Sequence, residues 1–272
     1  MQILIPVLIC LGIAAVCAII LTVSTVLFGV KEDETFLAIR DALPGANCGA
    51  CGYSGCDGYA RALSEGKIKE ANLCIPGGTK TAEEIAAVLG VEAGDVVKMF
   101  AYIGCNGTCD ASKKDEKHLR DGFSSCKEAA AHWEGENVCV FACIGLGDCV
   151  SSCPNNAIVL TDGVAKVISS LCTGCGLCAK NCPHGTIRML KVGTTMAIGC
   201  SNHDKGALTR KMCVNGCIGC TKCERTCPNG AITMENNLPV LNYDKCLSCG
   251  LCAEACPIHA IHKDAFICDK CV

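Results

Sequence analysis

Cysteines at short, regular spacings are the residues of this chain with the clearest chemical potential. The segment CVNGCIGCTKCERTCP, residues 213–228, holds five cysteines in close succession. The earlier segment CVFACIGLGDCVSSCP, residues 139–154, aligns with it without a gap, and Leu146 stands where Cys220 would be matched. Neighbouring thiols two positions apart point toward one small object better than they pair with each other. The spacing therefore favours metal ligation over disulfides.

The composition supports the same interpretation. The chain has 29 cysteines in 272 residues, whereas the competing class, secreted disulfide scaffolds, is usually short. Its net charge of -3 gives no indication of nucleic-acid binding. Aromatic residues make up only 4%, a thin supply for a hydrophobic core. We therefore expect bound metal groups to form much of the core, in a reducing compartment, and the metal-free chain to fold poorly.

The chain from Cys139 onward is a duplication with a constant offset, which matches Cys139 with Cys213 and Cys172 with Cys246. Three of its four cysteine runs keep the pattern C-x2-C-x2-C-x3-C-P, at 172–183, 217–228 and 246–257. The unit resembles the bacterial two-cluster ferredoxin, in which the fourth cysteine of a run ligates the other [4Fe-4S] cluster. This crossover predicts three ligand sets: Cys217, Cys220, Cys223 and Cys256; Cys246, Cys249, Cys252 and Cys227; Cys172, Cys175, Cys178 and Cys153.

The fourth ferredoxin-like site is one ligand short because Leu146 interrupts its run. The cysteines that remain are Cys143, Cys149 and Cys182. Two outcomes are open: a three-iron cluster on three thiolates, or replacement of the missing ligand by Cys139, which shortly precedes Cys143. We favour Cys139 because it is present and nearby, which leaves Cys213 for another role.

Cysteines outside these sets point to a further cluster. The candidates are Cys105, Cys109, Cys126, Cys200 and Cys213. The segment AYIGCNGTC resembles MAIGCSNHD at the entrance of each repeat, and the first copy carries an insertion that includes Cys126. We predict a sixth cluster on Cys105, Cys126, Cys200 and Cys213, with free buried thiols as the alternative. Cys268 and Cys271 form a terminal C-x2-C without evident partners.

A different four-cysteine pattern lies nearer the N-terminus, in the glycine-rich segment NCGACGYSGC and beyond it. The spacing C-x2-C-x4-C-x17-C joins Cys48, Cys51, Cys56 and Cys74. Four thiolates suit one [4Fe-4S] cluster, and zinc is the alternative. Glycines let the backbone wrap closely around such a group. Beside the ferredoxin runs, the iron-sulfur interpretation is favoured.

Helices are expected to position this four-cysteine region. A short helix should include Phe36 and Leu43 and end at Pro44-Gly45, and a polar helix should run from Asp57 to about Glu70. The segment TAEEIAAVLG reads as a helix that begins with a capping box from Thr81 to Glu84.

The N-terminal segment 3–30 carries no charge, and its length exceeds the roughly 20 residues that span a bilayer. A cleaved signal peptide would begin with a basic region, which is absent here. We therefore predict a retained transmembrane helix with everything after it in the cytoplasm, where thiols stay reduced. Cys10 and Cys17 within it are expected to be packing residues.

The predicted fold class is α+β, with five parts. A transmembrane anchor spans 1–30, a small helical [4Fe-4S] domain 31–90, and a connector with extra cysteines 91–138. Two tandem two-cluster ferredoxin-like modules follow, at 139–195 and, with the tail, at 196–272. No dinucleotide fingerprint, P-loop, nucleophile elbow or HExxH motif occurs, so we expect no complete active site beyond electron transfer.

This order of segments resembles the B subunit of the Rnf-type ion-translocating ferredoxin:NAD oxidoreductase. The segment NCGACGYSGCDGYA through Cys74 carries the resemblance most specifically, and CIGLGDC fits the longer, anaerobe-type members. The resemblance implies a protein of the bacterial inner membrane that takes electrons from reduced ferredoxin. Its five [4Fe-4S] clusters, and a possible sixth, would relay them to membrane and flavin-binding partner subunits and finally to NAD, with Na+ or H+ translocated.

Two other interpretations compete with this one. A membrane-tethered polyferredoxin could serve a hydrogenase or a redox-sensor reductase without ion pumping. A zinc-rich scaffold would have no redox role, but the Cys-Pro runs argue against it.

Overall fold

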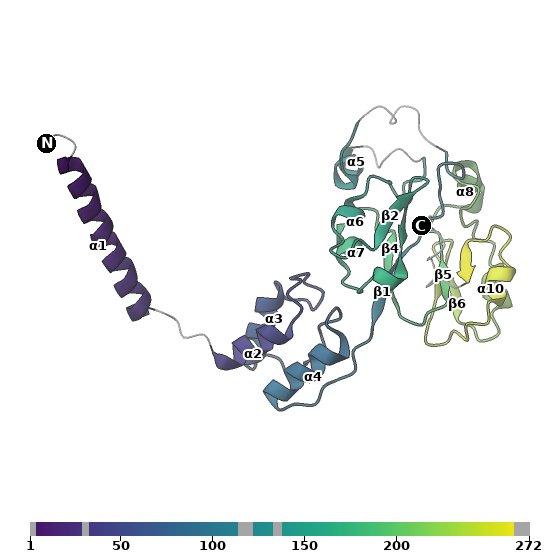
Figure 1. Ribbon diagram of the computed structural model, residues 1–272. Coiled ribbons are helices and arrows are strands. Elements are labelled where there is room, and N and C mark those ends of the chain that lie inside the picture. The colour runs from purple at the N-terminus through teal and green to yellow at the C-terminus, as the bar shows by residue number, and fades with distance from the viewer. Residues whose placement is uncertain (1–3, 29–32, 114–121, 133–137, 264–272) are drawn as a thin grey trace.

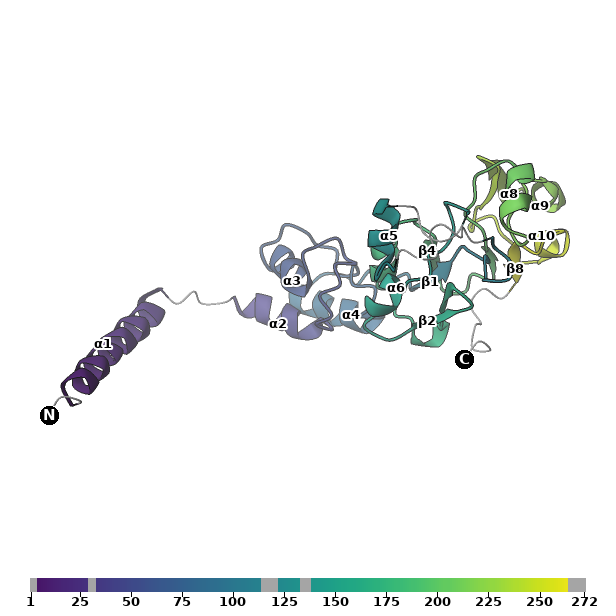
Figure 2. The same ribbon diagram turned by 90° about the horizontal axis from the view of Figure 1, so that it is seen from above.

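The structure is a computed structural model that describes residues 4–28, 33–113, 122–132 and 138–263. It mixes helices with two-stranded antiparallel sheets, as the α+β prediction requires. Figures 1 and 2 agree on the arrangement: a helical domain lies next to a first mixed module, and a second mixed module lies beyond it. The first helix stands apart from all three.

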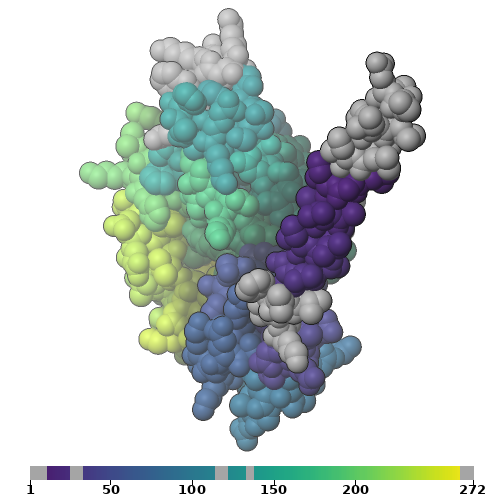
Figure 3. All heavy atoms as spheres, turned by 90° about the vertical axis from the view of Figure 1, so that its left-hand side faces the viewer, coloured from purple at the N-terminus to yellow at the C-terminus, as the bar shows by residue number. Residues whose placement is uncertain are grey.

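This first helix, α1, spans Leu4–Phe28 and contains no charged residue. Its side chains are described for residues 11–24, and all of these are exposed. Figure 3 shows the helix projecting beside the helical domain. Among the residues that the structure describes, no helix combines the length and the apolar character needed to cross a bilayer. The predicted anchor over 1–30 therefore gains no support here and stays a prediction.

The helical domain consists of three helices around a small core: α2 (Glu34–Ala42), α3 (Cys56–Ser64) and α4 (Gly78–Leu89). The Asp33 carboxylate caps α2 by accepting the Thr35 N–H at 3.1 Å. Ile39, Tyr59 and Ile85, one from each helix, are fully buried. The core is small but complete, which holds the loop with the first three cysteines against α3.

Two of the expected helix boundaries are wrong. α3 ends at Ser64 rather than near Glu70, because Gly66 takes a positive φ of 68°. The amides of Gly66 and Lys67 then bond to the Leu63 and Ala62 carbonyls, as in a Schellman motif. α4 begins at Gly78, before Thr81, so no capping box forms there. The Thr81 hydroxyl instead donates to the Ala42 carbonyl and joins α4 to α2.

The two mixed modules repeat the same elements at the offset found in the sequence. In the first module, β2 (Ile158–Thr161) pairs with β3 (Val164–Val167), and in the second, β6 (Ile232–Glu235) pairs with β7 (Leu238–Leu241). Their short helices are α6 (Asp148–Ser151), η1 (Ser169–Leu171), α7 (Leu177–Asn181), α9 (Lys222–Thr226) and α10 (Leu251–Glu254). The tandem duplication is therefore present in three dimensions.

The segment predicted as a connector belongs to the first module. Its strand β1 (Met99–Ile103) pairs with β4 (Ile187–Lys191), as β5 (Met196–Ile198) pairs with β8 (Ile261–Lys263) in the second module. The segment also carries α5 (Cys126–His132), and the second module carries α8 (Gly206–Met212). Each unit thus begins with a strand that precedes its first cysteine run, because the strand after the last run needs a partner.

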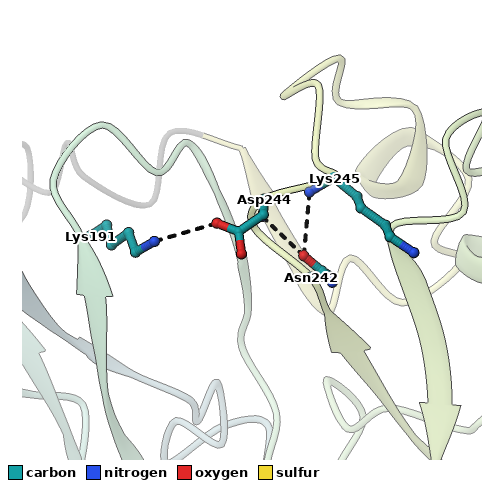
Figure 4. Close-up of polar contacts among 4 residues, drawn as sticks. All are labelled: Lys191, Asn242, Asp244 and Lys245. Atoms are coloured by element: carbon teal, nitrogen blue, oxygen red, sulfur yellow. Dashed lines mark hydrogen bonds and ion pairs between the residues drawn. The ribbon is translucent and has the colours of Figure 1, made fainter.

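A polar contact joins the two modules at the surface (Figure 4). Lys191 in β4 lies 3.4 Å from the Asp244 carboxylate, and both side chains are exposed, so the pair contributes little. The Asn242 side-chain oxygen accepts the N–H groups of Asp244 and Lys245 at 3.0 and 3.3 Å (Figure 4). This turn fixes the entry of the chain into the run that starts at Cys246.

Candidate iron-sulfur sites

The second module brings together both predicted sets of four cysteines. One cavity is lined by Cys217, Cys220, Cys223 and Cys256. A second cavity is lined by Cys227, Cys246, Cys249 and Cys252. Each therefore takes three cysteines from one run and the fourth from the other, which is the crossover expected of two-cluster ferredoxins.

Backbone amides point at the sulfurs of the crossover cysteines. Ala231 N–H donates to Cys227 Sγ and Ala260 N–H donates to Cys256 Sγ, each at 3.3 Å. In the first module Ala157 N–H makes the matching bond to Cys153 Sγ, also at 3.3 Å. Such donors stabilise the thiolate form and tune a bound cluster.

The intact run of the first module is gathered in the same way. Burial raises the pKa of the Cys178 thiol to about 11, and the nearby thiols of Cys172, Cys175 and Cys153 contribute further. These are the four cysteines predicted for that site. Cys172 lies under β1, where the Ala101 N–H donates to its sulfur at 3.5 Å.

The helical domain also brings its four cysteines together. Burial raises the pKa of Cys74, and the thiols of Cys56, Cys51 and Cys48 act on it in the same direction. The Asn47 side chain holds the loop by accepting the Cys56 N–H at 2.8 Å. The Tyr59 hydroxyl donates to the Glu70 carbonyl at 2.6 Å, which fixes the segment that returns to Cys74.

The site interrupted by Leu146 differs from the expectation. Its cavity is lined by Cys143, Cys149, Cys182 and Cys126, and not by Cys139. Burial raises the pKa of Cys149 to about 12, with Cys143 and Cys126 adding to the shift. The fourth thiol beside this run therefore comes from the inserted segment.

Helix α5 places Cys126 at this cavity. The two carboxylate oxygens of Asp148 accept the N–H groups of Cys126 and Lys127, at 2.8 and 3.1 Å. Leu146 packs against the cluster of Cys126, Ala129 and Ile144. Leu146 cannot ligate, but it supports the helix that brings Cys126 to the cavity. The insertion in the first copy of the repeat was the only available signal for this exchange.

Cys139 lies in a different group. It lines a cavity with Cys105, Cys200 and Cys213, where the sequence had predicted Cys126. The structure thus places Cys126 and Cys139 in the opposite groups from those predicted. Cys109 is exposed and lines none of these cavities. Cys268 and Cys271 lie outside the described residues, as does the side chain of Cys10.

Three known families match parts of the chain. The family described as a putative Fe-S cluster matches residues 43–76. A 4Fe-4S dicluster domain matches 142–186 and again 216–260, and another dicluster family matches 171–232. The two copies of the first dicluster match are offset as the sequence repeat is.

Curated relatives resemble the chain over most of its length. The B subunit of the Na(+)-translocating ferredoxin:NAD(+) oxidoreductase complex of Acetobacterium woodii is 37% identical over 90% of this chain and 73% of the relative. The proton-translocating counterpart of Clostridium ljungdahlii is 37% identical over 80% of this chain and 77% of its own length. The B subunit of an ion-translocating oxidoreductase complex of Methanosarcina acetivorans is 35% identical over 75% and 77%.

The chain belongs to this family of B subunits. As a member it carries several [4Fe-4S] clusters, and the structure offers sites whose chemistry fits them. Each site offers four thiols, many of these cysteines are buried, and amides point at several of the sulfurs. Burial keeps many of these thiols protonated in the metal-free protein, so loading such a B subunit with clusters releases protons.

Sites for a single ion are a separate matter. Within the described residues, no group of three or more His, Cys, Asp or Glu side chains converges closely enough to hold one metal ion. A four-iron cluster is larger than one ion, so its thiolates stand farther apart. The four-cysteine sites of this B subunit line cavities, which suits a group larger than one ion.

Proposed function

We propose that the chain is the electron-relay subunit of a membrane-bound respiratory complex. It accepts electrons from reduced ferredoxin and passes them to partner subunits, and the complex reduces NAD and translocates Na+ or H+. When bound, each [4Fe-4S] cluster stores and transfers one electron at a time. The residues of this chain hold the clusters, exclude water from them and set their spacing.

The observation that carries this proposal is the continuity of the cysteine sites. Figures 1 and 2 place the helical domain, the first module and the second module in a row. Burial raises the pKa of Cys175 in the first module, and the Cys48 thiol of the helical domain contributes to that shift. The two sites are therefore neighbours, which supports transfer between the modules and the helical domain.

The described contacts support five ligand sets. We assign one cluster to the helical domain, on Cys48, Cys51, Cys56 and Cys74. Each module holds two more. The Leu146 site takes Cys126 as its fourth ligand, and the other three sets are those predicted from the cysteine runs.

The direction of transfer rests on the position of the helical domain. This domain follows α1 directly in the chain, and the second module lies farthest from α1 in Figure 1. We propose that reduced ferredoxin docks on the ferredoxin-like modules and that electrons leave through the helical domain to membrane and flavin-binding subunits.

We also propose that residues 3–30 anchor the chain as a single pass, with the cluster domains on the cytoplasmic side. The segment is uncharged, and α1 exposes large apolar side chains such as Leu11, Ile19 and Leu21, each 61–66% exposed. Such a surface is unfavourable in water and favourable in lipid.

The test uses membranes of the native host. Deleting the gene should abolish NAD reduction by reduced ferredoxin in these membranes, and the intact chain supplied in trans should restore it. Cys48→Ala should not restore it, whereas the control Cys109→Ala should. Full activity in the deletion strain would refute the proposal and favour the tethered electron carrier for another enzyme.

A further inference from the structure

Four cysteines outside the C-x2-C-x2-C-x3-C-P runs surround a cavity between the two modules. Cys105, Cys139, Cys200 and Cys213 line it, and Cys139, Cys200 and Cys213 are 7–8% exposed. Four thiols also line each of two cavities of the second module and the cavity of the Leu146 site. The same number of thiols is therefore gathered around a fourth cavity.

The four cysteines are related by the duplication. Cys139 and Cys213 occupy matching positions of the two repeats. Cys105 and Cys200 each follow the first strand of a module, β1 or β5, by one glycine. Each module thus contributes two equivalent ligands to a cavity that both modules share.

The amides that face these sulfurs obey the same symmetry. Cys105 Sγ accepts the N–H groups of Gly107 and Cys143, each at 3.4 Å. Cys200 Sγ accepts those of Asn202 and Cys217, at 3.4 and 3.3 Å. The buried Asn202 side chain adds a bond from its amide nitrogen to Cys139 Sγ at 3.3 Å. Five N–H groups directed at three sulfurs suit thiolates that ligate iron.

Reciprocal contacts between the modules hold the cavity in shape. From β4, Arg188 donates to the Cys200 carbonyl at 3.1 Å, and from the equivalent position in β8, His262 bonds to the Tyr102 hydroxyl at 2.9 Å. The equivalent glycines 104 and 199 are packed so closely that an added Cβ would lie 2.9 and 2.7 Å from the other module. The interface is therefore close-fitting around the thiols.

We propose that Cys105, Cys139, Cys200 and Cys213 hold a sixth [4Fe-4S] cluster, which bridges the two ferredoxin-like modules. Its bridging role rests on the proposed function, but its existence does not. Cys143 and Cys217 line the adjoining cavities of the two modules, and their own N–H groups bond to the bridging sulfurs. A cluster held by these four cysteines would accept one electron from the cluster of one module, which is thereby oxidised, and would pass it to the cluster of the other, which is thereby reduced.

The test is iron content of the full chain, reconstituted anaerobically with 57Fe and sulfide. Cys139→Ala and Cys213→Ala should each lose up to four irons relative to Cys109→Ala, an exposed cysteine that serves as the matched control. Retention of part of the cluster as a three-iron form, seen by EPR, would equally support the site. Unchanged iron and spectra in both variants would overturn it.

The double variant makes the test specific to one shared cluster. Cys139→Ala/Cys213→Ala should lose no more than about four irons, because both residues bind the same cluster. Additive loss of about eight irons would place the two residues on different clusters and refute the assignment. Should the variants fail to fold, the unaltered chain still decides: about 24 irons supports the sixth cluster and about 20 overturns it. Zinc in place of iron would instead refute the proposed function itself.

Discussion

Replacement of Cys126 by alanine tests how the structure completes the site that Leu146 interrupts. Cys126 is 8% exposed and lines the cavity of Cys143, Cys149 and Cys182. Without it three thiolates remain, which suffice for a three-iron cluster. We expect the Cys126→Ala chain to lose about one iron and to show a three-iron EPR signal of about one spin per chain when oxidised.

A compensating substitution makes this prediction sharper. Leu146 occupies the standard ligand position of the run, so Cys126→Ala/Leu146→Cys should regain the fourth iron and lose the three-iron signal. Leu146 packs partly against α5, and shortening its side chain should lower the free energy of unfolding by about 1–2 kcal/mol. Both samples are compared by 57Fe Mössbauer spectroscopy and by EPR before and after dithionite.

The reasoning would be wrong if Cys126→Ala kept the iron content and spectra of the unaltered chain. It would also be wrong if Cys139→Ala produced a three-iron signal that Leu146→Cys then removed, because Cys139 would in that case be the missing ligand. The exposed Cys109→Ala again serves as the control.

Three further substitutions test the elements around the sites. Asp148→Ala removes the acceptor for the first amides of α5, so it should lower the free energy of unfolding by about 1 kcal/mol. It should also raise the fraction of three-iron cluster, which EPR measures. Asp110→Ala, at an exposed position, should change neither quantity. Gly174→Ala should speed cluster loss far more than Gly176→Ala, measured as bleaching of the cluster absorbance. Both glycines have φ near 72°, so the backbone strain of an alanine is similar at the two positions. Only at position 174 would the added Cβ meet a backbone oxygen, that of Met99, at 2.2 Å. Burial lowers the pKa of His262, so the folded chain binds fewer protons there than the unfolded one, and stability should fall as pH drops below about 6.5. His262→Gln should make the melting temperature depend less steeply on pH, and an unchanged pH dependence would contradict this prediction.

Local spacing predicted which cysteines of the second module line the same cavity. Cys217, Cys220 and Cys223 line a cavity with Cys256 because the C-x2-C-x2-C turn fixes three thiols and the second run of the module supplies the fourth. The constant offset of the repeat likewise predicted which elements of the two modules correspond. These features depend on short-range geometry, which a single sequence encodes directly.

The exchange of Cys126 and Cys139 could not be predicted in the same way. Cys139 is close to Cys143 in sequence, but the chain between them turns Cys139 toward Cys200 and Cys213. Cys126 reaches the Leu146 cavity because the Asp148 carboxylate accepts the hydrogen bond of the first amide of α5. Both outcomes depend on how an inserted segment and two modules pack, and spacing alone carries no information about that packing.

Helix boundaries failed for a related reason. The motif from Thr81 to Glu84 matched a capping box, yet α4 begins earlier and Thr81 bonds to α2 instead. The Thr81 hydroxyl finds its acceptor in another helix, the Ala42 carbonyl, and the local sequence pattern contains no information about that contact.

Iron and acid-labile sulfide per chain, with EPR of the dithionite-reduced sample, test the central claim most directly. The full chain should be purified anaerobically and assayed without reconstitution. The account predicts at least about 20 irons with matching sulfide, and the signals of several interacting reduced [4Fe-4S] clusters. Near-zero iron with stoichiometric zinc would contradict it and leave the chain without a means of relaying electrons.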